Sequence, residues 1–199
     1  EFVRAEVRGA IDTYHSDIID RTDYARHTRG SCIVYASRLT SMTYGRTEPY
    51  NKFTTAKGLL VVAPDEGDPL DGRQSPLAIL HEDTSPGQCW CFSGSSGSVA
   101  ISLAQPIVVD GVSIDQPARP PLTRTAPKRC TVWGLASVDD PAPVNLGEFE
   151  FNEAGHYVQS FPLESNGEAF PLVRLEVHSN HGNPDKTCLY RFRVHGVEA

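Results

Sequence analysis

The sequence predicts an all-β fold, an antiparallel β-sandwich of the jelly-roll type preceded by a short N-terminal helix. Apolar residues alternate with other residues in segments 99–103, 173–177 and 188–194, and this period of two is typical of half-buried strands. Sixteen glycines and 15 prolines supply turns between short strands. No helical pattern separates the strands, which disfavours a parallel sheet with crossover helices.

The N-terminal helix is predicted over residues 2–19. Four apolar residues recur at spacings of four, three and four and fall on one helical face: Val7, Ile11, Tyr14 and Ile18. This face is compatible with docking on the domain or with ending an upstream coiled coil. Residues 94–97, a Gly-Ser-Ser-Gly turn, are interpreted as a hairpin tip. Four short apolar runs are further candidate strands: 59–63, 77–80, 107–109 and 132–135.

Size and charge restrict the classes of function. The chain has 199 residues, of which 39% are hydrophobic and 22% charged, so it is long enough for one folded domain and is not of disordered composition. Its net charge of −7 lacks the basic footprint of a nucleic-acid binder or of a protein held on anionic lipid. No run approaches the roughly 20 apolar residues of a membrane span. Because the chain starts at Glu1, we expect a piece of a longer protein with any membrane anchor upstream.

Metal and catalytic motifs are weak. Cys89 and Cys91, with Cys188, offer possible zinc ligands, but this two-residue spacing gives poor geometry and no second pair exists. We therefore favour buried cysteines, an interpretation that also suits Cys32 and Cys130, and the odd total of five leaves at least one unpaired within the chain. No nucleophile elbow, phosphate-binding loop or zinc-protease motif is present, so we expect no enzyme. The polar stretch 81–88 is compatible with a hard-cation site or a solvated loop.

Three longer segments carry a specific resemblance. Residues 86–97 read PGQCWCFSGSSG, residues 126–135 read APKRCTVWGL, and residues 179–196 read SNHGNPDKTCLYRFRVHG. Together with shorter matches, in order from residue 23 to residue 196, they resemble the motifs of SUN domains. The resemblance implies a helix or coiled-coil end over 1–22 and a SUN domain over 23–199.

The resemblance also implies a function. SUN domains are non-enzymatic homotrimers of inner-nuclear-membrane proteins, and they lie in the perinuclear lumen. There they bind the C-terminal peptide of KASH proteins of the outer nuclear membrane. The resulting LINC complex links the nucleoskeleton to the cytoskeleton and positions the nucleus. The expected partner is thus a KASH peptide, with no nucleic acid, and the domain reaches a membrane only through an upstream anchor.

Residues of the family's disulfide and cation site map onto this chain. The intradomain disulfide corresponds to Cys89 and Cys188, in keeping with an oxidising lumen. A monovalent cation, potassium or sodium, is expected in the loop before Cys89, held mostly by backbone carbonyls, and no organic cofactor is expected. Its expected ligands are Ala78, His81, Asp83, Gln88 and Tyr190.

The family's peptide pocket maps onto Thr125, Gln116, Lys186 and Tyr190. Lys186 replaces a tyrosine of the family, and its ammonium is suited to the terminal carboxylate of a peptide. The lid that pairs with the peptide as an added strand corresponds to about 43–76. Within it we expect the apolar residues to form the pairing edge: Leu59, Leu60, Val61 and Val62.

A binding module of another class is the alternative. Jelly-roll carbohydrate-binding or adhesion modules with a structural cation share the sandwich and carry their sites on loops. A sugar site requires exposed aromatic rings, whereas Trp90 and Trp133 stand in patterns that predict burial. The long polar segment 45–76 instead suits a peptide-binding arm, so the alternative is the less favoured interpretation.

Overall fold

The computed structural model describes residues 21–36, 52–54, 60–62, 75–117 and 123–199. In these ranges the chain consists of strands, turns and two short 3-10 helices, and none of its helices has the length and apolar character needed to cross a bilayer. The elements are η1 (His27–Arg29), β1 (Cys32–Ala36), β2 (Lys52–Thr54), β3 (Leu60–Val62), η2 (Pro76–Leu80), β4 (Trp90–Ser93), β5 (Gly97–Asp115), β6 (Arg129–Leu135), β7 (Val144–Glu150), β8 (Val158–Pro162), β9 (Ala169–Val177), β10 (Lys186–Leu189) and β11 (Arg191–Glu198).

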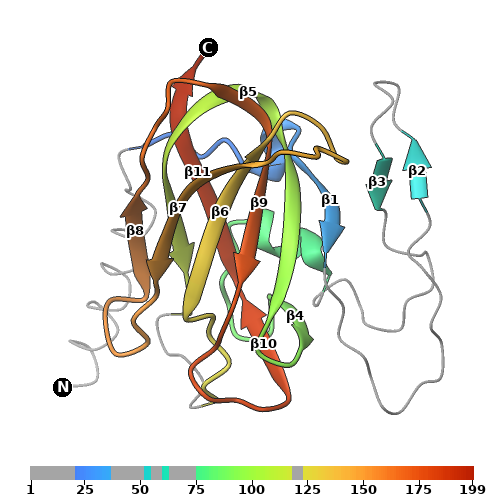
Figure 1. Cartoon of the computed structure of the whole chain (residues 1–199). Coiled ribbons are helices and arrows are strands. Elements are labelled where there is room, and N and C mark those ends of the chain that lie inside the picture. The colour runs from blue at the N-terminus through green and yellow to red at the C-terminus, as the bar shows by residue number, and fades with distance from the viewer. Residues whose placement is uncertain (1–20, 37–51, 55–59, 63–74, 118–122) are drawn as a thin grey trace, which may run out of the picture.

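The long strand β5 organises the main sheet, which is antiparallel throughout. Its first half pairs with β1 and β9, and the order continues from β9 to β6 and β7. Its second half pairs with β11 and β8. The register against β9 shifts between Ser102 and Ile107, and Figure 1 shows β5 curving over at this end of the domain. Because β5 pairs with both groups of strands, the sheet folds over into two layers. The predicted antiparallel β-sandwich is confirmed.

The hydrophobic core lies between these layers. Inward-facing residues of both halves of β5 belong to one buried cluster, for example Ile101 and Ile114. The alternation predicted around residues 99–103 and 173–177 is confirmed, because Val99, Ile101 and Leu175 are fully buried. Trp90 and Phe92 of β4 and Ile79 and Leu80 of η2 extend the same cluster.

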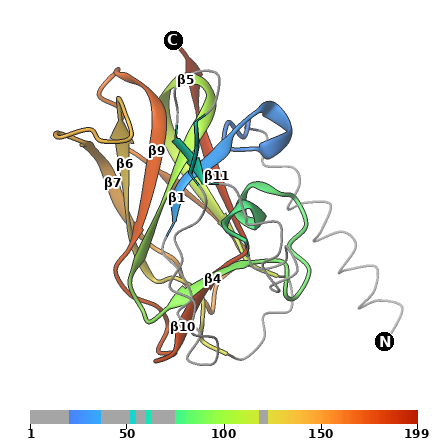
Figure 2. The ribbon, with the colours of Figure 1, turned by 90° about the vertical axis from the view of Figure 1, so that its right-hand side faces the viewer.

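Two small antiparallel ribbons accompany the main sheet. In the β4–β10 ribbon, Cys188 stands opposite Cys91 and Leu189 opposite Trp90. Figure 2 shows this ribbon at the end of the sandwich opposite the C-terminus. The second ribbon pairs β2 with β3, and β3 lies close to β1.

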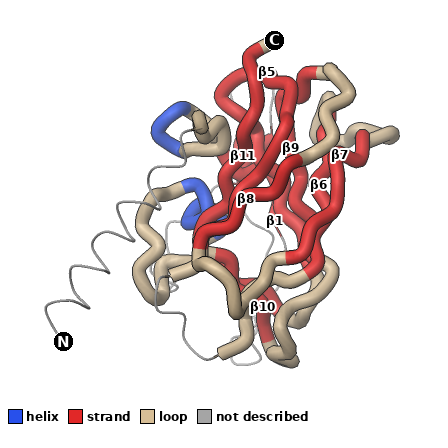
Figure 3. Tube along the Cα trace, turned by 90° about the vertical axis from the view of Figure 1, so that its left-hand side faces the viewer, coloured by secondary structure: helices blue, strands red, loops and turns tan. Residues whose placement is uncertain are grey.

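The last strand, β11, contacts residues 22–24 at the start of the described domain. The Tyr24 N–H donates to the Val194 carbonyl at 2.8 Å, and Asp23 forms an ion pair with Arg191 at 3.2 Å. His195 Nδ1 lies 2.9 Å from the Thr22 carbonyl. Figure 3 shows both short helices at one side of the strands, and η2 also contacts β11.

Three sequence predictions about local structure are wrong. The run 77–80 is a 3-10 helix rather than a strand, because Pro76 stands at its start and the Ser75 side chain caps it by accepting from the Leu77 N–H. The strand predicted over 188–194 is two strands, interrupted at Tyr190, which belong to different sheets. The turn 94–97 is no hairpin tip, since β4 and β5 also lie in different sheets. The helix predicted over 2–19 lies outside the described residues.

Candidate functional site

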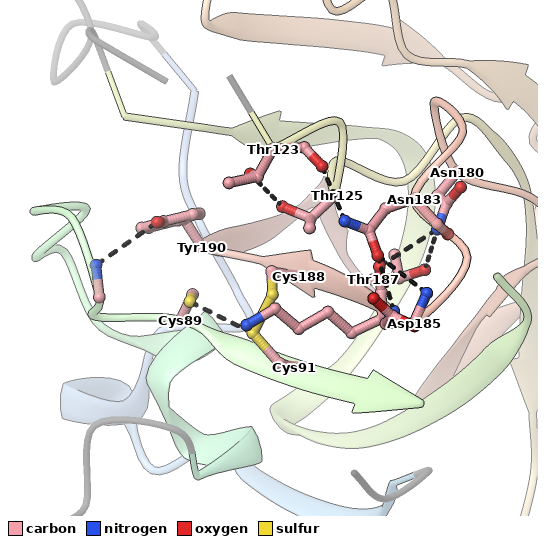
Figure 4. Close-up of a disulfide and its surroundings, with 12 residues drawn as sticks. Cys89, Cys91, Thr123, Thr125, Asn180, Asn183, Asp185, Thr187, Cys188 and Tyr190 are labelled. Carbon is pink, nitrogen blue, oxygen red and sulfur yellow. Dashed lines mark hydrogen bonds between the residues drawn. A yellow bond between two sulfur atoms is a disulfide. The ribbon is translucent and has the colours of Figure 1, made fainter. Parts of the chain in front are cut away.

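A disulfide joins the two strands of the β4–β10 ribbon, but it is not the disulfide implied by the resemblance. Cys91, rather than Cys89, is bonded to Cys188, with a Cα–Cα distance of 4.1 Å. The ladder explains the pairing, because Cys91 stands directly opposite Cys188, whereas Cys89 precedes the first residue of β4. Figure 4 shows Cys89 beside this bond, with its side chain on the same face.

Cys89 is a buried free thiol next to the disulfide. Its Sγ lies 3.6 Å from Cys91 Sγ, and the three sulfur atoms all lie within 4.8 Å of one another. Burial raises the pKa of the Cys89 thiol, while a hydrogen bond with Tyr190 and the positive charge of Lys186 oppose this rise. The prediction that Cys91 is buried is confirmed, although Cys91 is the bonded residue and Cys89 the free one. Cys130 is buried as expected, and Cys32 is half-buried.

Two of the predicted peptide-binding residues contact the backbone of Cys188. Gln116, directly after β5, donates from Nε2 to the Cys188 carbonyl at 3.4 Å, and its own N–H donates to the Tyr157 carbonyl. The Cys188 N–H donates to the Thr125 carbonyl at 2.8 Å. Gln116 and Thr125 are both buried, so their side chains lie beneath the surface of the site rather than on it. The structure therefore brings residues 116, 125 and 188 together from three separate segments.

The turn that carries Lys186 is held by two asparagines that the sequence analysis missed. Asn183 accepts the Lys186 N–H on Oδ1 at 3.0 Å, and its Nδ2 donates to the Thr123 carbonyl at 2.9 Å. Asn180 donates from Nδ2 to the carbonyls of Asn183 and Lys186. Figure 4 shows Thr123, Thr125 and Asn183 side by side. The turn-forming sequence Asn-His-Gly-Asn-Pro at 180–184 was the available signal, but one of its partners, Thr123, lies 60 residues away along the chain.

Arg124 adds an exposed cation beside Thr125. Its φ of 52° is the one positive value at a non-glycine residue within the described ranges. Such a conformation is uncommon for a side-chain-bearing residue and is held by the surrounding contacts. Thr125 on one side of it is hydrogen-bonded to Thr123 on the other, with 3.0 Å between their hydroxyl oxygens. The exposed face of the site thus presents Arg124 and the half-buried Lys186.

Tyr190 links the site to the loop where a cation is expected. Its hydroxyl accepts the Gly87 N–H at 3.4 Å and also contacts the Cys89 thiol. The loop folds on itself through hydrogen bonds: His81 N–H to the Ala78 carbonyl, Ser85 N–H to the Asp83 carboxylate and Gln88 N–H to the Ser85 carbonyl. Of the five expected ligand residues, Ala78 lies in η2, His81, Asp83 and Gln88 lie in this loop, and Tyr190 contacts the loop at Gly87. Their carbonyl and carboxylate oxygens suit a hard cation.

The expected lid is described in part. Leu60, Val61 and Val62 form β3, which pairs with β2 as an antiparallel hairpin, so a strand-forming arm is present near β1. Leu59 and most of the segment 43–76 lie outside the described residues. The pairing of this arm with a peptide stays a prediction.

The two tryptophans differ in exposure. Trp90 is buried in the core, as predicted, whereas Trp133 is half-buried. The Arg174 guanidinium lies 5.3 Å from the centre of the Trp133 ring, and Trp133 Nε1 donates to Glu176 at 2.9 Å. In the described part of the chain, Val197 is the one exposed large hydrophobic residue. The described tryptophans and other large hydrophobic residues thus form no exposed aromatic platform of the kind that stacks on sugars.

Comparison with known families agrees with the motif resemblance. The family model described as "Sad1 / UNC-like C-terminal" matches residues 71–198, well over half of the chain. The chain belongs to this family, the SUN domains. The match includes β4, β10 and the whole of the candidate site, but it begins after most of the expected lid.

Individual relatives carry the same domain in longer proteins. SUN domain-containing protein 3 of Bos taurus is 33% identical over 186 residues, which cover 91% of this chain and 48% of that protein. SUN domain-containing protein 5 of Homo sapiens is 32% identical, with 93% and 46% covered. Klaroid protein of Drosophila melanogaster is 29% identical, with 98% and 20% covered. The SUN domain described here thus spans half or less of these relatives.

Solved structures of other proteins share the fold. The family 32 carbohydrate-binding module of Streptococcus pneumoniae EndoD has a TM-score of 0.57 at 16% identity, covering 88% of this chain and 99% of that one. The C-terminal domain of a chitobiase from Bacteroides fragilis has a TM-score of 0.58 at 9% identity, covering 90% and 99%. At such low identity these similarities show the jelly-roll-like sandwich alone.

Proposed function

We propose that this SUN domain binds the C-terminal peptide of a KASH protein and takes part in a LINC complex across the nuclear envelope. The observation that carries the proposal is the convergence of Gln116 and Thr125 on the backbone of Cys188, between Lys186 and Tyr190. These four residues are the ones expected to line the peptide pocket. The function is binding and requires no chemical step.

The charge of the exposed face suits a peptide terminus. Lys186 and Arg124 are cationic, and Asn183 holds their two segments together, because it donates to the Thr123 carbonyl and accepts the Lys186 N–H. An ammonium facing a carboxylate forms a charge-assisted hydrogen bond, which is stronger than one between neutral groups. The preferred ligand is therefore a chain end with a free α-carboxylate rather than an internal peptide segment.

The assembly completes the proposal. A SUN domain that bridges two membranes lies in the perinuclear lumen as part of an inner-nuclear-membrane protein, and it acts as a homotrimer. The β2–β3 hairpin supports the addition of a peptide strand, because strand addition uses the backbone hydrogen-bonding groups of a sheet edge. A fold shared with carbohydrate-binding modules does not favour sugar binding, because function depends on the site rather than on the fold.

A monovalent cation, potassium or sodium, belongs to the same proposal. The loop around 81–88 supplies oxygen donors of the type that hard cations prefer, with Ala78, His81, Asp83, Gln88 and Tyr190 as the proposed ligand residues. Bound there, the ion would neutralise carbonyl dipoles and fix the loop against Tyr190, which borders the peptide site.

Binding of a synthetic peptide tests the function. The probe is a proline-rich peptide of KASH type with a free C-terminal carboxylate, and the control is the same peptide amidated at its end. Light scattering measures the mass of the complex while titration calorimetry measures affinity. We expect carboxylate-dependent binding to a trimer. A trimer that binds neither peptide contradicts the function.

Lysine substitution tests the site. Lys186→Gln removes a charge-assisted hydrogen bond worth about 1.5–3 kcal/mol, so affinity should fall about tenfold or more. The matched control is Lys128→Gln, which removes another lysine charge from an exposed ion pair with Glu150. Equal effects of the two substitutions contradict a specific contact between Lys186 and the carboxylate.

A further inference from the structure

Three sulfur atoms share one buried site beside the candidate peptide pocket, although a disulfide uses only two of them. We propose that Cys89, Cys91 and Cys188 form an internal thiol–disulfide exchange site, in which the Cys89 thiol attacks the Cys188 sulfur and displaces Cys91. The domain then has two disulfide isomers, Cys91–Cys188 and Cys89–Cys188. The inference concerns the chemistry of these sulfurs and stands independently of peptide binding.

Proximity is the first argument. Cys89 Sγ lies 3.6 Å from Cys91 Sγ and no more than 4.8 Å from Cys188 Sγ. All three side chains are buried together with Tyr190 in one cluster, so the effective concentration of the thiol at the disulfide is high. In such a site the internal thiol competes well with thiols from solution, because burial of the bond hinders their approach.

Reaching the attack geometry requires a defined movement. In-line attack on Cys188 places the attacking sulfur beyond Cys188 on the axis of the bond, whereas Cys89 Sγ lies 3.6 Å from Cys91 Sγ, too close to the leaving sulfur for that position. In-line attack on Cys188 therefore needs rotation of the Cys89 side chain and a small shift of its backbone. Cys89 precedes β4, so such a shift leaves the paired residues of the ribbon in place.

The exchange is balanced within the protein. The Cys89 thiol gives its proton to solvent, and the thiolate forms a bond with Cys188 Sγ. The Cys91–Cys188 bond breaks, its electron pair leaves on Cys91 Sγ, and Cys91 takes up a proton. One thiol and one disulfide are present before and after, so neither an oxidant nor a reductant is consumed.

The surroundings set the rate of the exchange. The reactive species is the thiolate, and burial raises the pKa of Cys89 despite the nearby Lys186 charge. Exchange should therefore be slow at neutral pH and accelerate roughly tenfold from pH 7 to pH 8, in proportion to the thiolate fraction. Disulfide rearrangements proceed over seconds to hours, so this site should respond within hours.

The two isomers place the disulfide differently. The Cys91–Cys188 bond joins the paired strands β4 and β10, whereas the Cys89–Cys188 bond joins β10 to the end of the loop that precedes β4. Moving Cys89 toward Cys188 disturbs the hydrogen bond from Gly87 to the Tyr190 hydroxyl. The exchange would thereby alter the position of the loop at the edge of the peptide site.

Mapping of the disulfide in the wild-type chain tests the proposal. The native protein is incubated at pH 7 and pH 8, quenched with acid, and labelled in denaturant with N-ethylmaleimide. Chymotrypsin, which cleaves after Trp90, separates Cys89 from Cys91, and mass spectrometry identifies the cysteine linked to Cys188. We expect the maleimide label to move from Cys89 to Cys91 in a growing fraction of molecules, faster at pH 8. A label confined to Cys89 at both pH values after a day overturns the proposal.

Two single variants provide a second measurement. Cys91→Ala should form a Cys89–Cys188 disulfide in a glutathione redox buffer, and Cys89→Ala should keep Cys91–Cys188 with no further exchange. If Cys91→Ala folds but leaves both Cys89 and Cys188 open to maleimide after the same treatment, Cys89 does not reach Cys188 and the proposal fails. If that variant does not fold, the wild-type mapping decides alone.

Discussion

Gln116 Nε2 donates a hydrogen bond to the backbone carbonyl of Cys188 at 3.4 Å, and this contact joins the end of β5 to the β4–β10 ribbon. Among the described strands, those of the ribbon share no ladder with the main sheet. Its attachment depends on such single contacts, on the hydrogen bond from Cys188 to Thr125, and on the burial of Trp90 and Phe92. Stability of the ribbon and geometry of the candidate site are therefore coupled.

Loss of Cys188 should destabilise the domain more than loss of Cys91. The disulfide spans 97 residues, and removal of such a bond typically costs about 2–5 kcal/mol. Cys188→Ala removes the partner of both isomers, whereas Cys91→Ala leaves Cys89 able to replace it. Urea unfolding under oxidising conditions measures the two free energies. Equal losses would show that Cys89 provides no substitute bond.

Substitution of the buried carboxylate Asp115→Asn should be severe. Asp115 accepts from Arg193 Nε at 2.9 Å, and Arg191 lies 3.8 Å away. Burial raises the pKa of Asp115, while the two guanidinium groups oppose this rise and favour the ionised form. Removal of one partner from a buried ion pair costs about 3–5 kcal/mol. Glu150→Gln, in the exposed pair with Lys128, should cost under about 1 kcal/mol in the same urea experiment. A similarly small loss for Asp115→Asn would mean that its carboxyl group is already neutral.

The buried His195 should make the domain sensitive to acid. Its Nδ1 donates to the Thr22 carbonyl and its Nε2 lies 2.8 Å from Ser113 Oγ. Burial lowers the pKa of His195, so the folded state holds it neutral at pH values where the unfolded chain, with a pKa near 6.5, is protonated. This stabilising contribution is complete above pH 6.5 and is lost as pH falls toward the folded pKa. The slope is up to about 1.4 kcal/mol per pH unit.

Replacement of His195 by Gln isolates this effect. The free energy of unfolding is measured from pH 7.5 to pH 5 in wild type and in His195→Gln. Other groups contribute equally to both proteins, so the difference between the two curves should shrink toward acid pH. Parallel curves would rule out His195 as the source of the acid sensitivity.

Gly196→Ala tests the closest backbone approach in the second half of β5. A Cβ at Gly196 would lie 2.3 Å from the Val108 carbonyl oxygen, at the register shift between β11 and β5. Because the contacted atom is backbone, relief requires the strands to separate, and we expect a loss of about 1–3 kcal/mol. The neighbouring control Val197→Ala, at an exposed residue, should change stability by about 0.5 kcal/mol or less. Thermal unfolding compares the two, and an unchanged melting temperature for Gly196→Ala would contradict the close approach.

Alternation of apolar residues was sufficient to predict the strands with one buried face. Residues 99–103 and 173–177 are such segments, and both lie in the central strands β5 and β9. The strands β7 and β8 were not predicted, because both carry mostly half-buried or exposed residues and β7 contains Gly147 at a φ of 146°. Edge strands of this kind lack the strong period that a sequence pattern requires.

Local sequence could not decide the disulfide. Cys89 and Cys91 are two residues apart and therefore share one face of an extended chain, so both are candidates for Cys188. The choice depends on the register of β10 against β4, which is a long-range property. The resemblance, by contrast, located Thr125 and Gln116, which bond to the backbone groups of Cys188, so neither contact depends on the Cys188 side chain or leaves a pattern in the local sequence.

The hydrogen bonds of Thr22, Asp23 and Tyr24 with β11 also have a kinetic consequence. Contacts between residues some 170 positions apart close the domain, and folds dominated by such distant contacts form slowly. A ribosome that has translated the chain only as far as β10 exposes a sandwich in which β5 still lacks one neighbour along its second half. The nascent domain thus stays open, with an unpaired strand edge available to chaperones, until β11 emerges.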